Sequence, residues 1–189
     1  MGLNKKKPAF ITVWTICAQG RTYSQNATDH LQRLVGTSAQ RLVIAEQVAF
    51  AKSDSGTPVE DVPREAQVIA SAVKAGESQG LDQALVSNFF RSQIEANKLI
   101  QYSLLAEWRR VGRAPGHVPV DLAGTVRPEL DQLGTELIAE LTETAALQAS
   151  TSCRSDVAKA VGKYVSAHKN KFCPLRVIAL DRAMAATCT

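Results

Sequence analysis

Apolar residues recur along the chain at the three- and four-residue spacing of helices, and no segment alternates apolar and polar residues as strands do. The clearest series begins near Thr28 or Asp29, either of which can cap a helix. Its apolar positions are Leu31, Leu34, Val35, Leu42, Ala45, Val48 and Ala49. Residues 53–58 are rich in turn formers. The pattern therefore predicts a long first helix that ends near Lys52.

Later periodic segments predict five more helices, over residues 61–79, 83–110, 121–149, 153–167 and 174–186. Pro63 falls in the first turn of the second helix, where a missing N–H does no harm. Asp82 caps the long third helix, and Pro128 places the proper start of the fourth near Arg127. Residues 111–120 hold two glycines and two prolines and form the clearest loop.

The fold class that follows is all-α, a single-domain bundle of about six helices with long first and third helices. Aromatic residues make up 5% of the chain, and common Ala, Leu, Gln and Glu favour helices over strands. The loop at 111–120 is a candidate boundary, but about 80 residues on either side cannot easily build two cores. One domain is therefore expected.

The first 20 residues are typical of an export signal. Lys5, Lys6 and Lys7 precede the apolar stretch AFITVWTICA, and Ala18-Gln19-Gly20 offers small residues at a cleavage site. The stretch is too short to span a bilayer comfortably. We therefore expect a signal peptide over residues 1–20, a mature domain over residues 21–189 outside the membrane, and a periplasmic or secreted location. The alternative is an N-terminus that is disordered or buried.

Charge argues against nucleic acid as a partner. The formal net charge of +4 falls to +1 without the three N-terminal lysines. No basic stripe with interleaved aromatic residues is present.

The chain has four cysteines, of which Cys17 would leave with the signal. Cys153 and Cys188 bracket the last two predicted helices, and a bridge between them would pin the C-terminal pair. Cys173 would then be free, or it competes for one of those partners. No Cys-x-x-Cys spacing appears, so no metal site is expected.

Polar residues at helical spacings are the main candidates for function. Arg41 and Lys52 are eleven residues apart and so point from one face of one helix. Asn97 and Gln101 stack in the same way on another helix. Apolar neighbours flank all of them, and acidic residues at matching positions are few. Because an unpaired buried cation is costly, an anionic ligand is the expected counter-charge.

The run Arg41, Lys52, Arg64-Glu65 and Asn97-x-x-x-Gln101 resembles the all-helical chorismate mutases. The flanking words AQRLVIAEQVAFAK, PVEDVPREAQ and SQIEANKLIQYSLLAEW add to the resemblance. The N-terminal signal, the long third helix, Arg127 and the pair Cys153 and Cys188 look like the secreted subclass. In that subclass one chain carries a complete site, a disulfide ties the C-terminal segment, and a homodimer is the usual state.

This resemblance implies the rearrangement of chorismate to prephenate in the aromatic amino acid pathway, with no cofactor, covalent intermediate or proton transfer. Lys52, Gln101 and Arg41 would be the catalytic residues, with Lys52 and Gln101 as donors to the ether oxygen. The carboxylate-binding arginines would be Arg41, Arg64 and Arg127. Glu65 would accept from the ring hydroxyl, and Asn97 would contact that hydroxyl or a carboxylate.

Two positions depart from the secreted relatives. Gln101 stands where they commonly carry a carboxylic acid, and Asn97 replaces the more usual serine or threonine. A carboxyl group must be protonated to donate to the ether oxygen, whereas an amide donates at any pH. The alternative function is an exported helical interaction protein that kept the fold without the activity.

Overall fold

The computed structural model describes the backbone of residues 16–189 and the side chains from residue 28 onward. Over this range the chain forms seven α-helices and two short helical turns, with no strand. The helices are α1 (Ile16–Ser55), α2 (Val62–Glu77), α3 (Gln83–Val111), α4 (Arg127–Glu143), α5 (Ala145–Gln148), α6 (Cys153–Ala167) and α7 (Pro174–Met184). The turns are the π-helical η1 (Leu122–Val126) and the 3-10 turn η2 (Lys169–Lys171). The predicted all-α class is confirmed, with α1 and α3 the longest helices.

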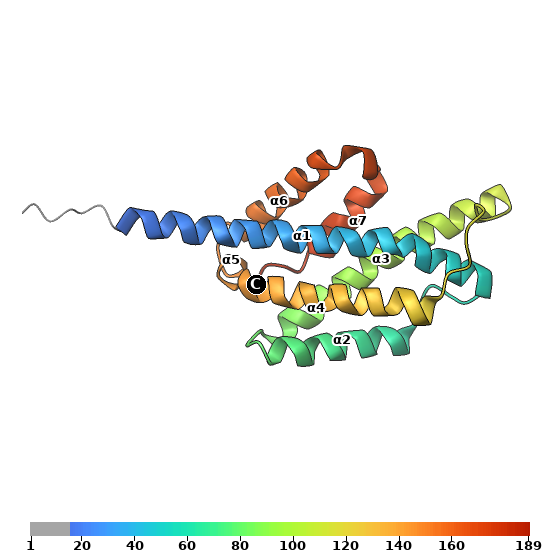
Figure 1. Cartoon of the computed structure of the whole chain (residues 1–189), viewed down its shortest axis with the longest axis horizontal. Helices are drawn as coiled ribbons and strands as arrows, with labels where there is room; N and C mark the ends of the chain where they lie inside the picture. Colours follow the sequence, from blue (N-terminus) through green and yellow to red (C-terminus); the bar gives the residue numbers. More distant parts are fainter. Residues whose placement is uncertain (1–15) are drawn as a thin grey trace, which may run out of the picture.

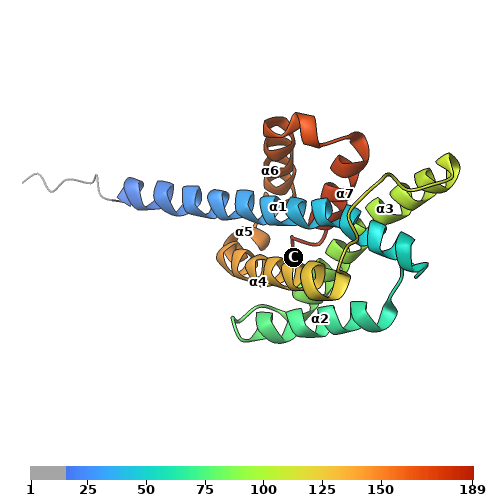
Figure 2. The same ribbon diagram turned by 45° about the vertical axis from the view of Figure 1, so that its right-hand side comes forward.

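α1 is the axis of the bundle. In Figure 1, α6 and α7 lie on one side of α1 and α4 and α2 on the other, while α3 crosses the bundle obliquely. The turned view keeps this arrangement (Figure 2). Because other helices cover α1 on several sides, Ala39 and Ile44 are both buried, although five positions along the helix set their side chains about 140° apart.

α1 begins earlier than predicted. Its first residue is Ile16 rather than Thr28 or Asp29, and its N-terminal end extends past the neighbouring helices (Figure 1). No proline lies between residues 16 and 29, and Thr and Asp cost little inside a helix. Capping preference alone therefore does not start this helix. The predicted export signal lies largely outside the described residues, and no helix within the described part of the chain is long and apolar enough to cross a bilayer.

Side-chain caps fix the starts of α2 and α3. The Asp61 carboxylate accepts from the backbone N–H of Arg64 at 3.2 Å, and that of Asp82 accepts from Leu85 at 2.8 Å. Between the two helices the carbonyl of Gly76 accepts from Leu81, and Gly80 has a φ of 79° that favours glycine. α2 and α3 therefore form a tight antiparallel hairpin.

Two apolar clusters hold the bundle. The larger one joins α1 to α3, α4, α6 and α7, and its largest fully buried side chains include Phe89, Phe90, Leu137 and Leu180. The smaller one packs Ile44 and Val48 of α1 against Val126 and Leu133. Because Val126 ends η1, this second cluster fixes the position at which α4 begins.

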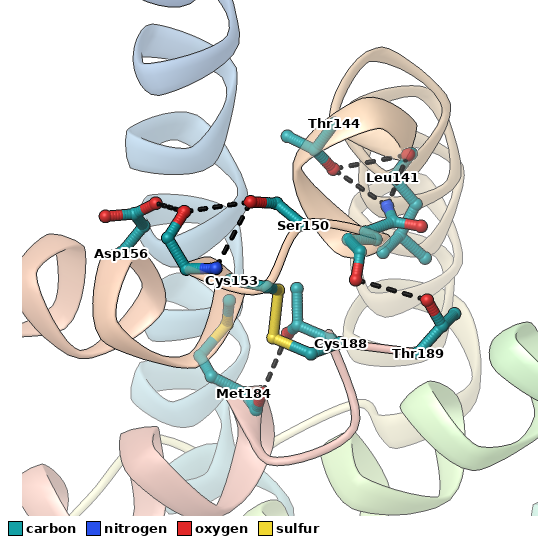
Figure 3. The surroundings of a disulfide bond; sticks show 11 residues. Leu141, Thr144, Ser150, Cys153, Asp156, Met184, Cys188 and Thr189 are labelled. Carbon is teal, nitrogen blue, oxygen red and sulfur yellow. Dashed lines mark hydrogen bonds between the residues drawn. A yellow bond between two sulfur atoms is a disulfide. The ribbon is translucent and has the colours of Figure 1, made fainter.

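A disulfide between Cys153 and Cys188 ties the C-terminal segment to the start of α6, as predicted (Figure 3). Cys173 is exposed and free. Beside the bridge, both the backbone N–H and the hydroxyl of Thr189 donate to the carbonyl of Gln148. The predicted fourth helix is interrupted at Thr144, so its last turn is the separate helix α5.

Candidate active site

A cavity of about 480 Å³ opens between α1, α2, α3 and α4. All seven predicted site residues line it: Arg41, Lys52, Arg64, Glu65, Asn97, Gln101 and Arg127. They come from four helices of the chain that pack around the same space.

Arg41 lies deep in this cavity. Its side chain projects from α1, its Nη1 donates to the carbonyl of Leu130 at 2.8 Å, and the residue is only 5% exposed. Burial lowers its pKa to about 10, and the nearby charge of Asp131 partly offsets that effect. Arg41 is therefore cationic at neutral pH. Among the described residues its Nε has no hydrogen-bond partner.

Lys52 lies three helical turns further along α1. Its ammonium donates to the carbonyl oxygens of Pro58 and Val59 in the loop after the helix. Burial is the main cause that lowers its pKa, and Arg127 and Lys98 lower it further, against Asp61 and Glu65. Two of the three N–H donors of Lys52 are used in this way, which leaves one for a ligand.

The two remaining arginines face carboxylates. Arg64 Nη2 donates to both oxygens of Asp131, at 2.9 and 3.2 Å. Arg127, the first residue of α4, lies 3.7 Å from a carboxylate oxygen of Asp61. Helix packing thus brings acidic partners from distant positions, and the expectation that such partners are few is wrong for Arg64.

Glu65 is paired with a lysine that sequence reasoning missed. Lys98 Nζ lies 3.3 Å from the Glu65 carboxylate and 2.8 Å from that of Glu95. Burial pulls the pKa of Lys98 down, but the bonds to Glu95 and Glu65 raise it overall. Lys98 follows Asn97 directly and so points about 100° away from it on the helix. Only the approach of α2 turns Lys98 into a lining residue, and no sequence signal marks it.

Asn97 and Gln101 are joined to each other. Asn97 Nδ2 donates to the backbone carbonyl of Arg41 at 2.9 Å, and Gln101 Nε2 donates to Asn97 Oδ1 at 2.6 Å. Both residues are buried, and within the described part of the chain Gln101 Oε1 has no partner. The two amides thus connect α3 to α1 at the level of Arg41.

The lining carries an excess of positive charge. Five cationic side chains and three carboxylates face the cavity, and the carboxylates belong to Asp61, Glu65 and Asp131. Among the described residues, each of these carboxylates has a cation within ion-pair distance, whereas Arg41 and Lys52 have no carboxylate there. One buried and one half-buried cation without an ionic partner, together with neutral amide donors, suit a small doubly charged anion.

An all-helical bundle in which α1 to α4 surround a cavity with more cationic than acidic side chains is the class that the fold and the site define. Residues 32–102 match the model of the family described as chorismate mutase type II. The chain is 31% identical over 156 residues to the secreted chorismate mutase of Mycolicibacterium smegmatis, which covers 82% of this chain and 84% of that protein.

Two solved chorismate mutases share the fold. The structure from Burkholderia phymatum has 42% identity and a TM-score of 0.80, and it covers 86% of this chain and 98% of its own. The structure from Burkholderia thailandensis has 34% identity and a TM-score of 0.79, with 84% and 99% covered. The chain belongs to the chorismate mutase type II family.

Proposed function

We propose that this member of the chorismate mutase family rearranges chorismate to prephenate in the cavity between α1, α2, α3 and α4. The reaction would belong to aromatic amino acid biosynthesis. The observation that carries the proposal is the pair Arg41 and Lys52, a buried and a half-buried cation that have no carboxylate partner among the described residues. Chorismate is a dianion, and its two charges equal the excess of lining cations over lining carboxylates.

The reaction requires a cavity of the right shape and fixed charges and donors, and it requires no nucleophile. It is unimolecular, so the protein must hold the substrate in the conformer in which the breaking C–O bond and the forming C–C bond align. Negative charge grows on the ether oxygen as the C–O bond breaks. Fixed donors aimed at that oxygen lower the barrier because they stabilise the transition state more than the substrate.

Lys52 and Gln101 are the residues that we assign to the ether oxygen. Lys52 has one N–H left after its two bonds to loop carbonyls, and Gln101 has a second N–H after its bond to Asn97. Arg41 would use its unpartnered Nε and its planar guanidinium on a substrate carboxylate.

Arg64 and Arg127 would exchange partners when substrate binds. Arg64 would leave Asp131 and Arg127 would leave Asp61 to face a carboxylate of the substrate, because both pairs are partly exposed and hence weak. Glu65, held by Lys98, would accept from the ring hydroxyl.

The test is conversion of chorismate, followed by ultraviolet absorbance, with the oxidised protein from Arg21 onward. We expect turnover by the wild type, and a fall in kcat/KM on the order of 10²- to 10³-fold in Lys52→Ala, since one transition-state donor is lost. Lys74→Ala removes an exposed α2 lysine outside the cavity and should leave kcat/KM unchanged. Equal activity in wild type and Lys52→Ala would contradict the mechanism. A folded wild type without turnover would favour the interaction protein.

We further propose that the protein acts in the periplasm or outside the cell, and that it forms a homodimer. The name of the secreted relative from Mycolicibacterium smegmatis supports the location, and the family resemblance supports the dimer. N-terminal sequencing of the periplasmic protein tests cleavage near Gly20, and light scattering tests the dimer. An uncleaved cytosolic chain would contradict the first proposal, and a monomeric mass the second.

A further inference from the structure

We propose that Asn97 is a positioning residue, which fixes the orientation of the Gln101 amide rather than binding the substrate itself. This inference rests on the proposed function, because it assigns Asn97 a role in presenting a donor to the ether oxygen. It differs from the expectation that Asn97 contacts the ring hydroxyl or a carboxylate of the substrate.

Both polar ends of Asn97 already have partners within the protein. Its Nδ2 donates to the backbone carbonyl of Arg41 at 2.9 Å, and its Oδ1 accepts from Gln101 at 2.6 Å. The residue is only 8% exposed. A substrate group would therefore have to displace a buried hydrogen bond before it could reach Asn97, which makes direct binding unfavourable.

The backbone carbonyl of Arg41 decides which way both amides point. A carbonyl oxygen only accepts, so Asn97 must turn its NH₂ group toward it. The Oδ1 of Asn97 then faces Gln101, and Gln101 must offer its own NH₂ group in return. If the Gln101 amide were reversed, two carbonyl oxygens would face each other across this short distance.

As a consequence, the Gln101 amide presents its NH₂ group, a hydrogen-bond donor, in a fixed orientation. One N–H is bound to Asn97, and the second N–H of the same nitrogen remains in a residue that lines the cavity. Without Asn97, the amide of Gln101 could rotate and present its oxygen, which would repel the developing charge on the ether oxygen. Asn97 thus acts through Gln101, and it also ties that donor to the helix that carries Arg41 and Lys52.

A double-mutant cycle in kcat/KM tests this. The proteins are the wild type, Asn97→Leu, Gln101→Leu and the double variant, because leucine removes the hydrogen bonds of each amide and still fills much of its space. We expect both single variants to lose kcat by a similar factor with little change in KM. The double variant should lose hardly more than Gln101→Leu alone, since residues that act as a unit are not additive.

Gln93→Leu is the matched control. Gln93 is another buried amide of α3, with bonds to Ser38 at 2.9 Å and to the carbonyl of Ala183 at 3.1 Å, and it does not line the cavity. Its loss should lower the unfolding temperature and leave kcat unchanged. This separates a general effect of removing a buried amide from an effect transmitted through Gln101.

The positioning role would be overturned if the loss of kcat/KM in the double variant equalled the product of the two single losses and if Asn97→Leu also raised KM. That result would favour direct contact between Asn97 and the substrate. If circular dichroism shows that Asn97→Leu is unfolded, Asn97→Ala takes its place in the cycle under the same criterion. A folded wild type without chorismate turnover would contradict the proposed function itself, and the positioning role would fall with it. Turnover with multiplicative losses would overturn the positioning role alone.

Discussion

Burial acts on the charged and the neutral donors of the cavity in different ways. Lys52 and Arg41 pay for desolvation with lowered pKa values, whereas Gln101 is neutral and has no proton to lose. Arg41 keeps a pKa of about 10, so its protonated form still dominates at neutral pH. The pH dependence of the reaction should therefore follow the ionisation of Lys52 rather than that of a carboxyl group.

We predict a flat profile of kcat/KM, which reports the ionisation of the free protein, from about pH 5 to 8, followed by a fall on the alkaline side. The donor Lys52 works only when protonated, and burial lowers its pKa below the ordinary 10.5, so activity is lost as pH rises toward that lowered value. In Gln101→Glu the fall should begin at lower pH, because a carboxyl group donates only when protonated. Steady-state rates with parallel unfolding measurements at each pH give the comparison. A wild-type rate that falls steeply as the pH rises from 5 to 8 would contradict the role of Gln101 as a neutral donor.

Asp131 is the residue that we expect to weaken substrate binding. Its carboxylate holds Arg64 and lies in the cavity wall, where it repels an incoming dianion. Asp131→Asn should lower KM by roughly twofold to fivefold, in line with a partly screened charge interaction of about 1 kcal/mol or less. Glu129→Gln makes the same charge change at an exposed α4 position outside the lining and should leave KM unchanged. A higher KM in Asp131→Asn would mean that Asp131 orients Arg64 instead.

At the scale of elements, the distance between α2 and α3 decides whether Glu65 and Lys98 meet. Gly76 allows a close approach at the turn end of the hairpin, because a Cβ at this position would lie 2.7 Å from Cγ2 of Val86. The two helices approach closely where α2 ends, and the paired side chains then face each other along the hairpin. Glycine is required here by contact rather than by backbone conformation.

Gly76→Ala should lower the free energy of unfolding by about 1–3 kcal/mol, since the added methyl group must displace the buried Val86. Gly162→Ala in α6 is the matched substitution, because nothing lies within 4 Å of its Cβ position. That variant should be more stable by about 0.5–1 kcal/mol, the usual gain from alanine in a helix. Urea unfolding measures both. Stabilisation by Gly76→Ala would show that α2 can move away without cost.

At the scale of the whole molecule, the disulfide ties the segment after α7 to the start of α6. It joins residues 35 positions apart, and hydrogen bonds from Thr189 to Gln148 continue the link to α5 (Figure 3). Neither cysteine lines the cavity. The bridge should therefore affect stability and leave the chemistry alone.

Replacing Cys153 and Cys188 together by serine should lower the free energy of unfolding by about 3–4 kcal/mol, because the unfolded chain gains the freedom of the open loop. The folded variant should keep its kcat. Cys173→Ser changes only the exposed free thiol and should match the wild type in both respects. Urea unfolding of the oxidised proteins gives the difference. Equal midpoints for the double variant and the wild type would contradict a stabilising role of the bridge.

The sequence by itself determined where the helices lie and which helix faces carry the polar candidate residues. Helical spacing depends only on local geometry, so the placement of Arg41 with Lys52 and of Asn97 with Gln101 on common faces could be read directly. Turn residues and caps fixed most helix ends to within a few residues. The start of α1 was the main error, since residues that favour a cap do not force one.

Only the tertiary structure decided which of these polar groups are paired. Asp131 meets Arg64 across 67 positions and Lys98 meets Glu65 across 33, and such contacts depend on how whole helices pack. The same packing left Arg41 and Lys52 without a carboxylate among the described residues and joined Asn97 to Gln101 and to the backbone of Arg41 by hydrogen bonds. Spacing along a helix is a local property, whereas the partner of a side chain on another helix is set by the packing of the whole core.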